Sequence, residues 1–222
     1  MNYLADRRLE EKERRRADIL DAAVAVAATD GIDDMTMDDV ARKARLSRAL
    51  LYVYFQDKSD LLAGLCCRAL ELLQQRFAEA AARYRRGLEQ IEGCGRAYVA
   101  FSQEFPVYFE ALARFEARSP NPSCGPDAAP GNEHECMLRG DKVHAVMIEC
   151  IQRGIADGSI RADVGSPVLV SFTLWGFLHG IIQLSATKAN VMAQHGMSTQ
   201  QLIDQALAMS MISLSPAAAS PP

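Results

Sequence analysis

Residues 36–58, TMDDVARKARLSRALLYVYFQDK, contain the most specific pattern in the chain. Thr36 can cap a first short helix, and Asp39 three residues later completes a box-like capping pair. Arg45-Leu46 forms the turn that follows, and Ser47 can cap a second short helix. This order of caps, apolar positions and turn predicts a helix-turn-helix.

The second helix of this pattern has an inward and an outward side. Leu51 and Phe55 are one helical turn apart and should point inward, which leaves Arg48, Ala49, Tyr52 and Val53 mostly outward. Such a helix can enter a DNA major groove, because Ala49 permits close approach of the backbone and Arg48 can reach bases or phosphates. The segment between Val40 and Gln56 contains no acid and four cations: Arg42, Lys43, Arg45 and Arg48.

The overall composition is that of an ordinary globular chain. Its 222 residues allow one large domain or two small ones. A composition of 49% hydrophobic and 23% charged residues excludes collagen-like, fully disordered and polytopic membrane proteins. The net charge of -4 excludes nucleic-acid binding through bulk positive charge. Any contact with DNA must therefore be local.

The rest of the chain favours helices throughout. Apolar residues recur at helical spacing in residues 19–26, 61–73 and 143–155, and strand-type alternation is nearly absent. Gly31 and Gly158 are expected to follow helix ends, and Ser166-Pro167 to begin a helix. The fold class expected is all-α, with an N-terminal three-helix helix-turn-helix domain followed by an all-helical ligand-binding and dimerisation domain.

Several boundaries follow from composition. A change from short to longer helices near residues 60–64 predicts a DNA-binding domain at 1–62 and an effector-binding and dimerisation domain at 63–222. The proline- and glycine-rich segment 119–132 predicts a mobile loop, and residues 213–222 a disordered tail. The charged arm at residues 7–16 is interpreted as a helical extension, with a DNA contact as the alternative.

Residues 19–65 resemble the DNA-binding domain of the tetracycline-repressor (TetR/AcrR) family of bacterial transcriptional regulators. The matching text is Ile19-Leu-Asp-Ala-Ala, Asp30-Gly-Ile, Thr36-Met-Asp-Asp-Val-Ala, Leu46-Ser-Arg, Leu51-Tyr-Val-Tyr-Phe and Asp57-Lys-Ser-Asp-Leu-Leu. The resemblance implies three N-terminal helices, a linking fourth helix and a helical domain that binds an effector and dimerises. It also implies a DNA-binding regulator, a repressor released from double-stranded operator DNA by a small apolar or aromatic ligand.

The resemblance also implies roles for individual residues. Ser47, Tyr52 and Lys58 match phosphate-contacting positions, whereas Arg48 and Ala49 match positions at base edges. Tyr54 is either a phosphate contact or a packing residue. The full set expected at DNA is Thr36, Arg45, Ser47, Arg48, Ala49, Tyr52, Tyr54 and Lys58.

Three positions depart from the family pattern, one of them Ala49, which stands where the second helix usually has glycine. Arg45 stands where the turn usually has glycine, and the turn geometry is expected to survive if Arg45 avoids positive φ. Leu50 replaces a residue that is commonly polar, so the base-contacting surface loses one hydrogen-bonding group.

Aromatic residues concentrate between Tyr98 and Phe115, around Pro106, which should end or kink a helix. The family places an effector pocket near such a break, while the alternative for each aromatic is core packing; His179 equally fits a hydrogen-bonded core histidine. The expected ligand-binding set is Phe77, Tyr98, Phe101, Phe105, Tyr108, Phe109, Met147, Trp175 and His179.

Two helices, at 143–155 and 168–183, resemble those that such regulators pair with a second copy. Residues 164–187 are apolar enough to suggest a membrane span, but scattered polar groups and the lack of flanking basic clusters favour a protein interface. Gly176 and Gly180 would allow close helix approach. The expected homodimer interface is Met147, Ile151, Phe172, Gly176 and Gly180.

Other functional classes lack signals. The charged N-terminus has no apolar signal-peptide region, so a cytoplasmic protein is expected. The six cysteines lack disulfide or zinc spacing and are interpreted as free thiols, with no metal site and no cofactor. No enzyme motif is present, so catalysis is not expected. The alternative function is a helical small-molecule sensor or binding protein whose DNA binding is weakened or lost.

Overall fold

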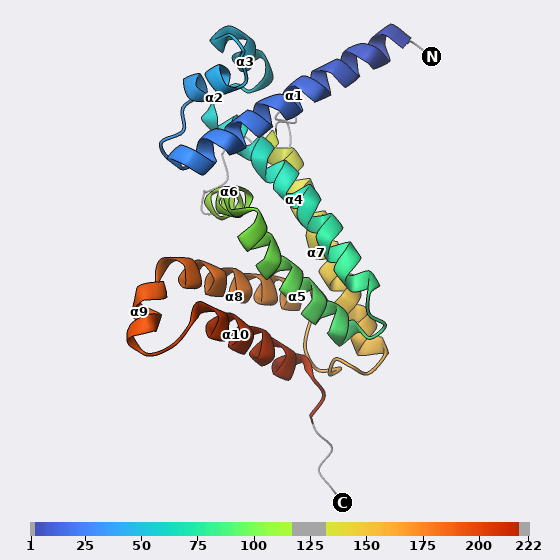
Figure 1. The fold of residues 1–222 in the computed structure, drawn as a ribbon. Helices are drawn as coiled ribbons and strands as arrows, with labels where there is room; N and C mark the ends of the chain where they lie inside the picture. The colour runs from blue at the N-terminus through green and yellow to red at the C-terminus, as the bar shows by residue number, and fades with distance from the viewer. Residues whose placement is uncertain (1–2, 117–131, 218–222) are drawn as a thin grey trace, which may run out of the picture. The chain divides into compact units, whose positions relative to one another are not determined.

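The computed structural model describes residues 3–116 and 132–217, and every regular element in those ranges is a helix (Figure 1). This confirms the all-α prediction. The helices are α1 (Tyr3–Asp30), α2 (Met37–Lys43), α3 (Arg48–Tyr54), α4 (Lys58–Ala82), α5 (Gly87–Glu104), α6 (Pro106–Glu116), α7 (Asn132–Ala156), α8 (Pro167–Thr187), α9 (Ala189–Gln194) and α10 (Thr199–Leu214).

Local sequence signals account for most helix ends. The Thr36 side chain accepts the Asp39 N–H, and the Asp39 carboxylate accepts the Thr36 N–H, so the capping box forms at α2. Gly31 (φ 84°) follows α1 and Gly158 (φ 73°) follows α7, both in the left-handed conformation that glycine favours. Pro106 separates α5 from α6, as proline without an N–H should.

The chain divides into two compact units. The first contains residues 1–70 and 105–139, and its core includes Ile19, Val40, Leu51, Phe55 and Leu61, all fully buried. Within this unit α1 packs against α2 and α6, and α2 packs against α3. Because Leu51 and Phe55 are buried, the inward side of α3 is the one that its spacing predicts.

The second unit contains residues 71–104 and 140–222. Within it α8 lies beside α10, and both contact α5 (Figure 1). The start of α5 lies so close to α7 that a Cβ atom on Gly87 would be 2.1 Å from the nitrogen of Gly154. Asp157 and Ser159, just after α7, accept the N–H groups of Gly87 and Leu88 at 2.8 and 3.1 Å and so cap α5.

Some boundaries differ from the sequence-based expectations. α4 runs without a break through residues 62 and 63, and α6 groups with the first unit. α10 continues to Leu214 rather than ending at residue 212, because Leu214 is buried and its carbonyl accepts the Arg161 N–H at 2.9 Å. Of the expected loop, residues 119–131 lie outside the described residues, and Asn132 already begins α7.

Candidate nucleic-acid interface and effector cluster

The turn between α2 and α3 contains an arginine in a left-handed backbone conformation. Arg45 has φ 57°, so it does not avoid positive φ as the sequence-based condition required. The turn is nevertheless closed, since Leu46 donates its N–H to the Ala41 carbonyl at 2.9 Å and Arg45 donates to Arg42 at 3.2 Å. The exposed Arg45 side chain therefore adds a cation beside α3 at the cost of backbone strain.

The exposed side of α3 carries three of the residues that were expected to contact DNA, Arg48, Ala49 and Tyr52. Ser47 caps the helix by accepting the Leu50 N–H at 3.2 Å. Arg48, Ala49 and Tyr52 are exposed with Ser47, while Tyr54 is half-buried. Val53, which sequence reasoning left out of the site, has 74% of its surface exposed.

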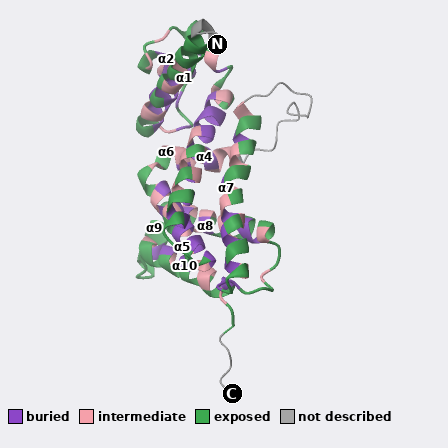
Figure 2. Cartoon of the chain, turned by 90° about the vertical axis from the view of Figure 1, so that its right-hand side faces the viewer, coloured by how far each residue is buried: buried purple, intermediate pink, exposed green. Residues whose placement is uncertain are grey.

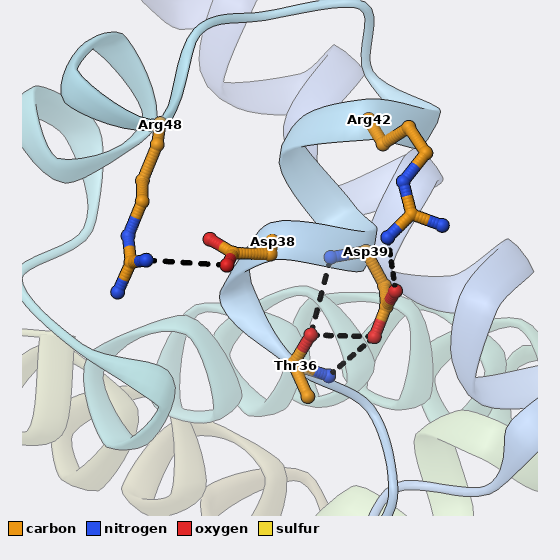
Figure 3. Close-up of polar contacts among 5 residues, drawn as sticks. All are labelled: Thr36, Asp38, Asp39, Arg42 and Arg48. Atoms are coloured by element: carbon orange, nitrogen blue, oxygen red, sulfur yellow. Dashed lines mark hydrogen bonds and ion pairs between the residues drawn. The ribbon is translucent and has the colours of Figure 1, made fainter.

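Arg48 is held by neighbours on both sides. Its Nη1 lies 3.2 Å from Oδ2 of Asp38 on α2 (Figure 3), and its guanidinium carbon lies 5.6 Å from the centre of the Tyr52 ring. A hydrogen bond with Tyr52 and the charge of Asp38 raise the pKa of Arg48. These contacts hold the cation at the start of α3.

The neighbouring acid has a different role. Asp39 accepts hydrogen bonds from Thr36 and from Arg42 (Figure 3), and these contacts lower its pKa. The negative charge of Asp39 is therefore used within α2 to cap the helix and to hold Arg42. Thr36 is exposed but occupied by the capping box, which gives it a structural role independent of DNA.

Lys58 is the first residue of α4, where the sequence places a phosphate contact. Its Nζ donates to the backbone carbonyl of Asp33 at 2.6 Å. The Asp33 carboxylate in turn accepts from Arg114 on α6, with Nη2 and Oδ2 2.8 Å apart. Within the first unit, Asp33 therefore joins the loop after α1 to both α4 and α6.

The expected ligand-binding residues fall in both units. Phe105, Tyr108 and Phe109 belong to the first unit, where Phe109 is buried and the other two are half-buried. The other six belong to the second unit: Phe77, Tyr98, Phe101, Met147, Trp175 and His179.

Within the second unit, most of these six form a continuous group of rings. Phe77 meets Tyr98 edge-on at 6.2 Å, the Tyr98 hydroxyl lies 2.7 Å from Nδ1 of His179, and the His179 ring lies 6.1 Å from that of Trp175. Trp175 meets His144, which sequence reasoning missed, at 5.5 Å.

Both histidines of this group are half-buried. Burial lowers the pKa of His179, and it lowers that of His144 despite the opposing charge of Asp141. His144 stacks on Phe172 at 4.0 Å and its Nδ1 lies 2.8 Å from the Ser171 hydroxyl. The group therefore places a few polar atoms, on Tyr98, the two histidines and Ser171, among apolar rings.

The expected dimer residues separate by exposure. Ile151 is fully buried within its own unit and Met147 nearly so, whereas Phe172, Gly176 and Gly180 on α8 are exposed. Further large apolar side chains are exposed on the same helix, as expected for an interface, and on α10, which was not predicted to take part: Val168, Leu169, Phe177, Leu184, Met209 and Ile212. Figure 2 shows the mixture of buried and exposed residues along these helices. By length and composition alone α8 could cross a membrane, but helices at protein interfaces meet the same criterion.

The remaining sequence-based predictions concern the state of the cysteines and metal binding. Five cysteines are buried free thiols, which confirms that interpretation for Cys66, Cys67, Cys94, Cys136 and Cys150; Cys124 lies outside the described residues. Across residues 3–116 and 132–217, no three or more His, Cys, Asp or Glu residues are grouped to hold a metal ion.

Two family models match the chain. Residues 19–65 match bacterial regulatory proteins of the tetR family, and residues 91–209, more than half of the chain, match the tetracyclin repressor-like C-terminal domain. The chain belongs to the tetR family. The first match covers α2, α3 and the turn between them, so the helix-turn-helix just described is the one that defines this tetR-family domain.

Individual tetR-family relatives match over different lengths. The chain is 32% identical to the transcriptional repressor KstR of Rhodococcus jostii over 104 residues, which cover 47% of this chain and 48% of KstR. It is 27% identical to the repressor NicS of Pseudomonas putida over 157 residues, 71% of each protein. For the regulator SrpR of Pseudomonas putida, identity is 38% over 55 residues, 25% of this chain and 26% of SrpR. The chain thus spans less than half the length of SrpR and of KstR.

Solved structures extend the similarity over most of the fold. A Rhodococcus protein of unknown function has a TM-score of 0.71 at 19% identity, covering 91% of this chain and 96% of that one. FadR of Bacillus subtilis in complex with stearoyl-CoA has a TM-score of 0.67 at 17% identity, covering 89% and 98%. The ketosteroid regulator KstR2 of Mycobacterium tuberculosis has 0.64 at 19%, covering 91% and 95%. At such identities these structures show a shared fold.

Proposed function

We propose that this tetR-family protein is a cytoplasmic repressor that binds double-stranded operator DNA as a homodimer and leaves it when a small apolar or aromatic ligand binds. The observation that supports DNA binding most strongly is the capped helix α3, whose exposed side presents Arg48 beside small and apolar residues. Three further cations, Arg42, Lys43 and Arg45, lie exposed on α2 and in the turn. Local positive charge of this kind offsets the net negative charge of the chain.

Selection from a random-sequence DNA duplex library, with the full chain as bait, tests this proposal. One pseudo-palindromic sequence is expected to be enriched. A gel-shift experiment should then show that the protein binds the DNA upstream of its own gene. Lack of any enriched sequence at low salt would contradict DNA binding and favour the alternative of a helical ligand-binding sensor.

The proposal of a homodimer rests on α8 and α10. Both helices expose large apolar side chains in a single chain, and Gly176 and Gly180 have open space where a Cβ would lie. A second copy could therefore approach α8 closely and cover these residues. Since a single α3 can contact only one half-site, a dimer also suits a two-fold symmetric operator. Ile151 is buried within its unit, so it is left out of the proposed contact surface.

The proposal of a small-molecule effector rests on the ring group of the second unit. Tyr98 and His179 supply polar atoms among Phe77, Trp175 and other apolar groups. Among the proteins of similar fold, FadR was solved in complex with stearoyl-CoA, and KstR2 is a ketosteroid regulator. Apolar effectors of similar character suit the rings found here. Titration of candidate compounds, followed by Trp175 fluorescence and operator affinity together, would identify the effector; a compound that changes fluorescence without changing operator affinity would not be one.

A further inference from the structure

The centre of the exposed side of α3 is apolar. Successive residues of an α-helix are separated by about 100° around its axis, so Ala49 and Val53, two residues on either side of Leu51, each lie about 200° from it. Leu51 is fully buried. Ala49 and Val53 therefore point directly away from the core, one turn apart on the same side of the helix.

The flanks of this pair differ in chemistry. On one flank, Tyr52 is exposed and Arg48 is fixed beside it and Asp38. On the other flank, Leu50 is exposed by 38%. Arg48 and Tyr52 thus stand at one edge of the α3 surface, whereas Ala49, Val53 and Leu50, at its centre and opposite edge, have no side-chain donor or acceptor. The half-buried Tyr54 lies on the same side as Leu50 but nearer the core.

Only one feature of a base pair in the major groove matches such a surface. Guanine, adenine and cytosine present donors and acceptors there, which would lose their water without replacement against Ala49 and Val53. Thymine presents, besides its acceptor O4, the 5-methyl group, which gains from apolar contact. The positive charges around α3 suit the phosphates on either side of the groove.

We propose that Ala49 and Val53, with Leu50 beside them, recognise thymine 5-methyl groups at the centre of each operator half-site. This inference rests on the proposed DNA binding and deepens it by naming the base that α3 selects. Arg48 at the edge of the same helix contacts a neighbouring base or phosphate.

The test uses the full chain and the duplex enriched by selection. Each thymine of the half-site is replaced in turn by deoxyuridine, which keeps every hydrogen-bonding group and lacks only the methyl. One or two replacements are expected to weaken binding by about fourfold each, the gain from burying one methyl group. Replacing the same pair by cytosine–guanine should weaken binding, and 5-methylcytosine at that position should recover part of the loss.

Variants assign the effect to α3. In Val53→Ala, the deoxyuridine penalty at one position should fall towards onefold, because the side chain that contacts the methyl is shortened. Val53 is largely exposed, so this change leaves the core intact. Arg42→Gln is the matched control: it should weaken all duplexes by the same factor and leave the deoxyuridine penalty unchanged.

The outcomes separate the two proposals. No enriched duplex would overturn the proposed function itself. An enriched duplex whose affinity is unaffected by deoxyuridine at every thymine would overturn the methyl-recognition proposal while leaving DNA binding in place. Deoxyuridine penalties that persist unchanged in Val53→Ala and in Ala49→Gly would overturn the assignment to this side of α3.

Discussion

Asp38 on α2 pairs with Arg48 on α3, with the carboxylate and guanidinium 3.2 Å apart, so the cation that is proposed to contact DNA already has a partner in the free protein. Both side chains are largely exposed, which makes the pair weak and readily exchanged. A base or phosphate that binds Arg48 competes with Asp38.

The change Asp38→Asn should therefore raise operator affinity by a factor of a few at low salt, since it frees Arg48 and removes a negative charge close to the DNA. The advantage should shrink as salt increases. Asp34→Asn is the control, because Asp34 is exposed in the same unit and has no ion pair among the described residues. Equal gains from both variants would indicate a general charge effect.

Two substitutions of Arg45 should differ in their effect on stability but not in their effect on operator affinity. Its left-handed backbone is strained for any residue with a Cβ, so Arg45→Gly should be about 1 kcal/mol more stable to urea than Arg45→Ala. Both variants lose the same positive charge and should lose operator affinity equally. If the two variants unfold at the same urea concentration, strain at this turn is unimportant.

The contact between α5 and α7 predicts a stability loss from one added methyl group. Gly87→Ala would bring its Cβ against the backbone of Gly154, and the forced shift should destabilise the chain by about 1–3 kcal/mol in thermal or urea unfolding. Gly140→Ala, within α7, meets nothing within 4 Å and should instead stabilise by about 1 kcal/mol through helix propensity. Tolerance of Gly87→Ala would show that the two helices can separate freely.

The two half-buried histidines predict acid sensitivity. Burial lowers the pKa of His144 and His179 in the folded protein below the ordinary value of about 6.5, so the unfolded chain binds protons more readily. Stability should be full above that pH and fall as the pH drops below it. In urea unfolding between pH 8 and 5 at fixed protein concentration, His179→Asn should flatten this dependence, whereas exposed His195→Asn should not.

The α8 surface predicts the oligomeric state. Phe172→Glu places a charge among exposed apolar side chains, so it should convert the dimer to a monomer in sedimentation and weaken operator binding strongly. Leu9→Glu, another exposed apolar position on α1, is the control and should leave the dimer intact. A wild-type chain that is monomeric at micromolar concentration would reject the dimer proposal.

Local signals were enough to predict the helices that build the candidate interface. These signals are the capping pair Thr36 and Asp39, the cap Ser47, and the one-turn spacing of Leu51 and Phe55. Each acts between residues three or four apart, so it can be recognised in the sequence without knowledge of the tertiary packing. Contacts between distant segments were not predictable in the same way. The pairing of Lys58 with the Asp33 carbonyl depends on how separate segments pack together.

The same limit applies to exposure and to backbone conformation. Ile151 was predicted as an interface residue because residues 143–155 resemble a dimer helix of the family, but only the packing of the second unit shows that it is buried. The exposed residues of α10 have no motif that marks them. Arg45 illustrates the remaining case, since only the closed turn shows that an arginine there takes a positive φ.

The near contact of Gly87 with Gly154 restricts how this protein can diverge over generations. A Cβ on Gly87 would overlap the α7 backbone, and one on Gly154 would lie 2.5 Å from the Ile160 side chain. A side chain at position 87 would require a wider gap between α5 and α7, whereas one at position 154 would require a residue smaller than Ile160. Descendant sequences are therefore expected to retain each glycine, or to exchange Gly87 only where the two helices lie further apart and Gly154 only alongside a smaller residue at position 160.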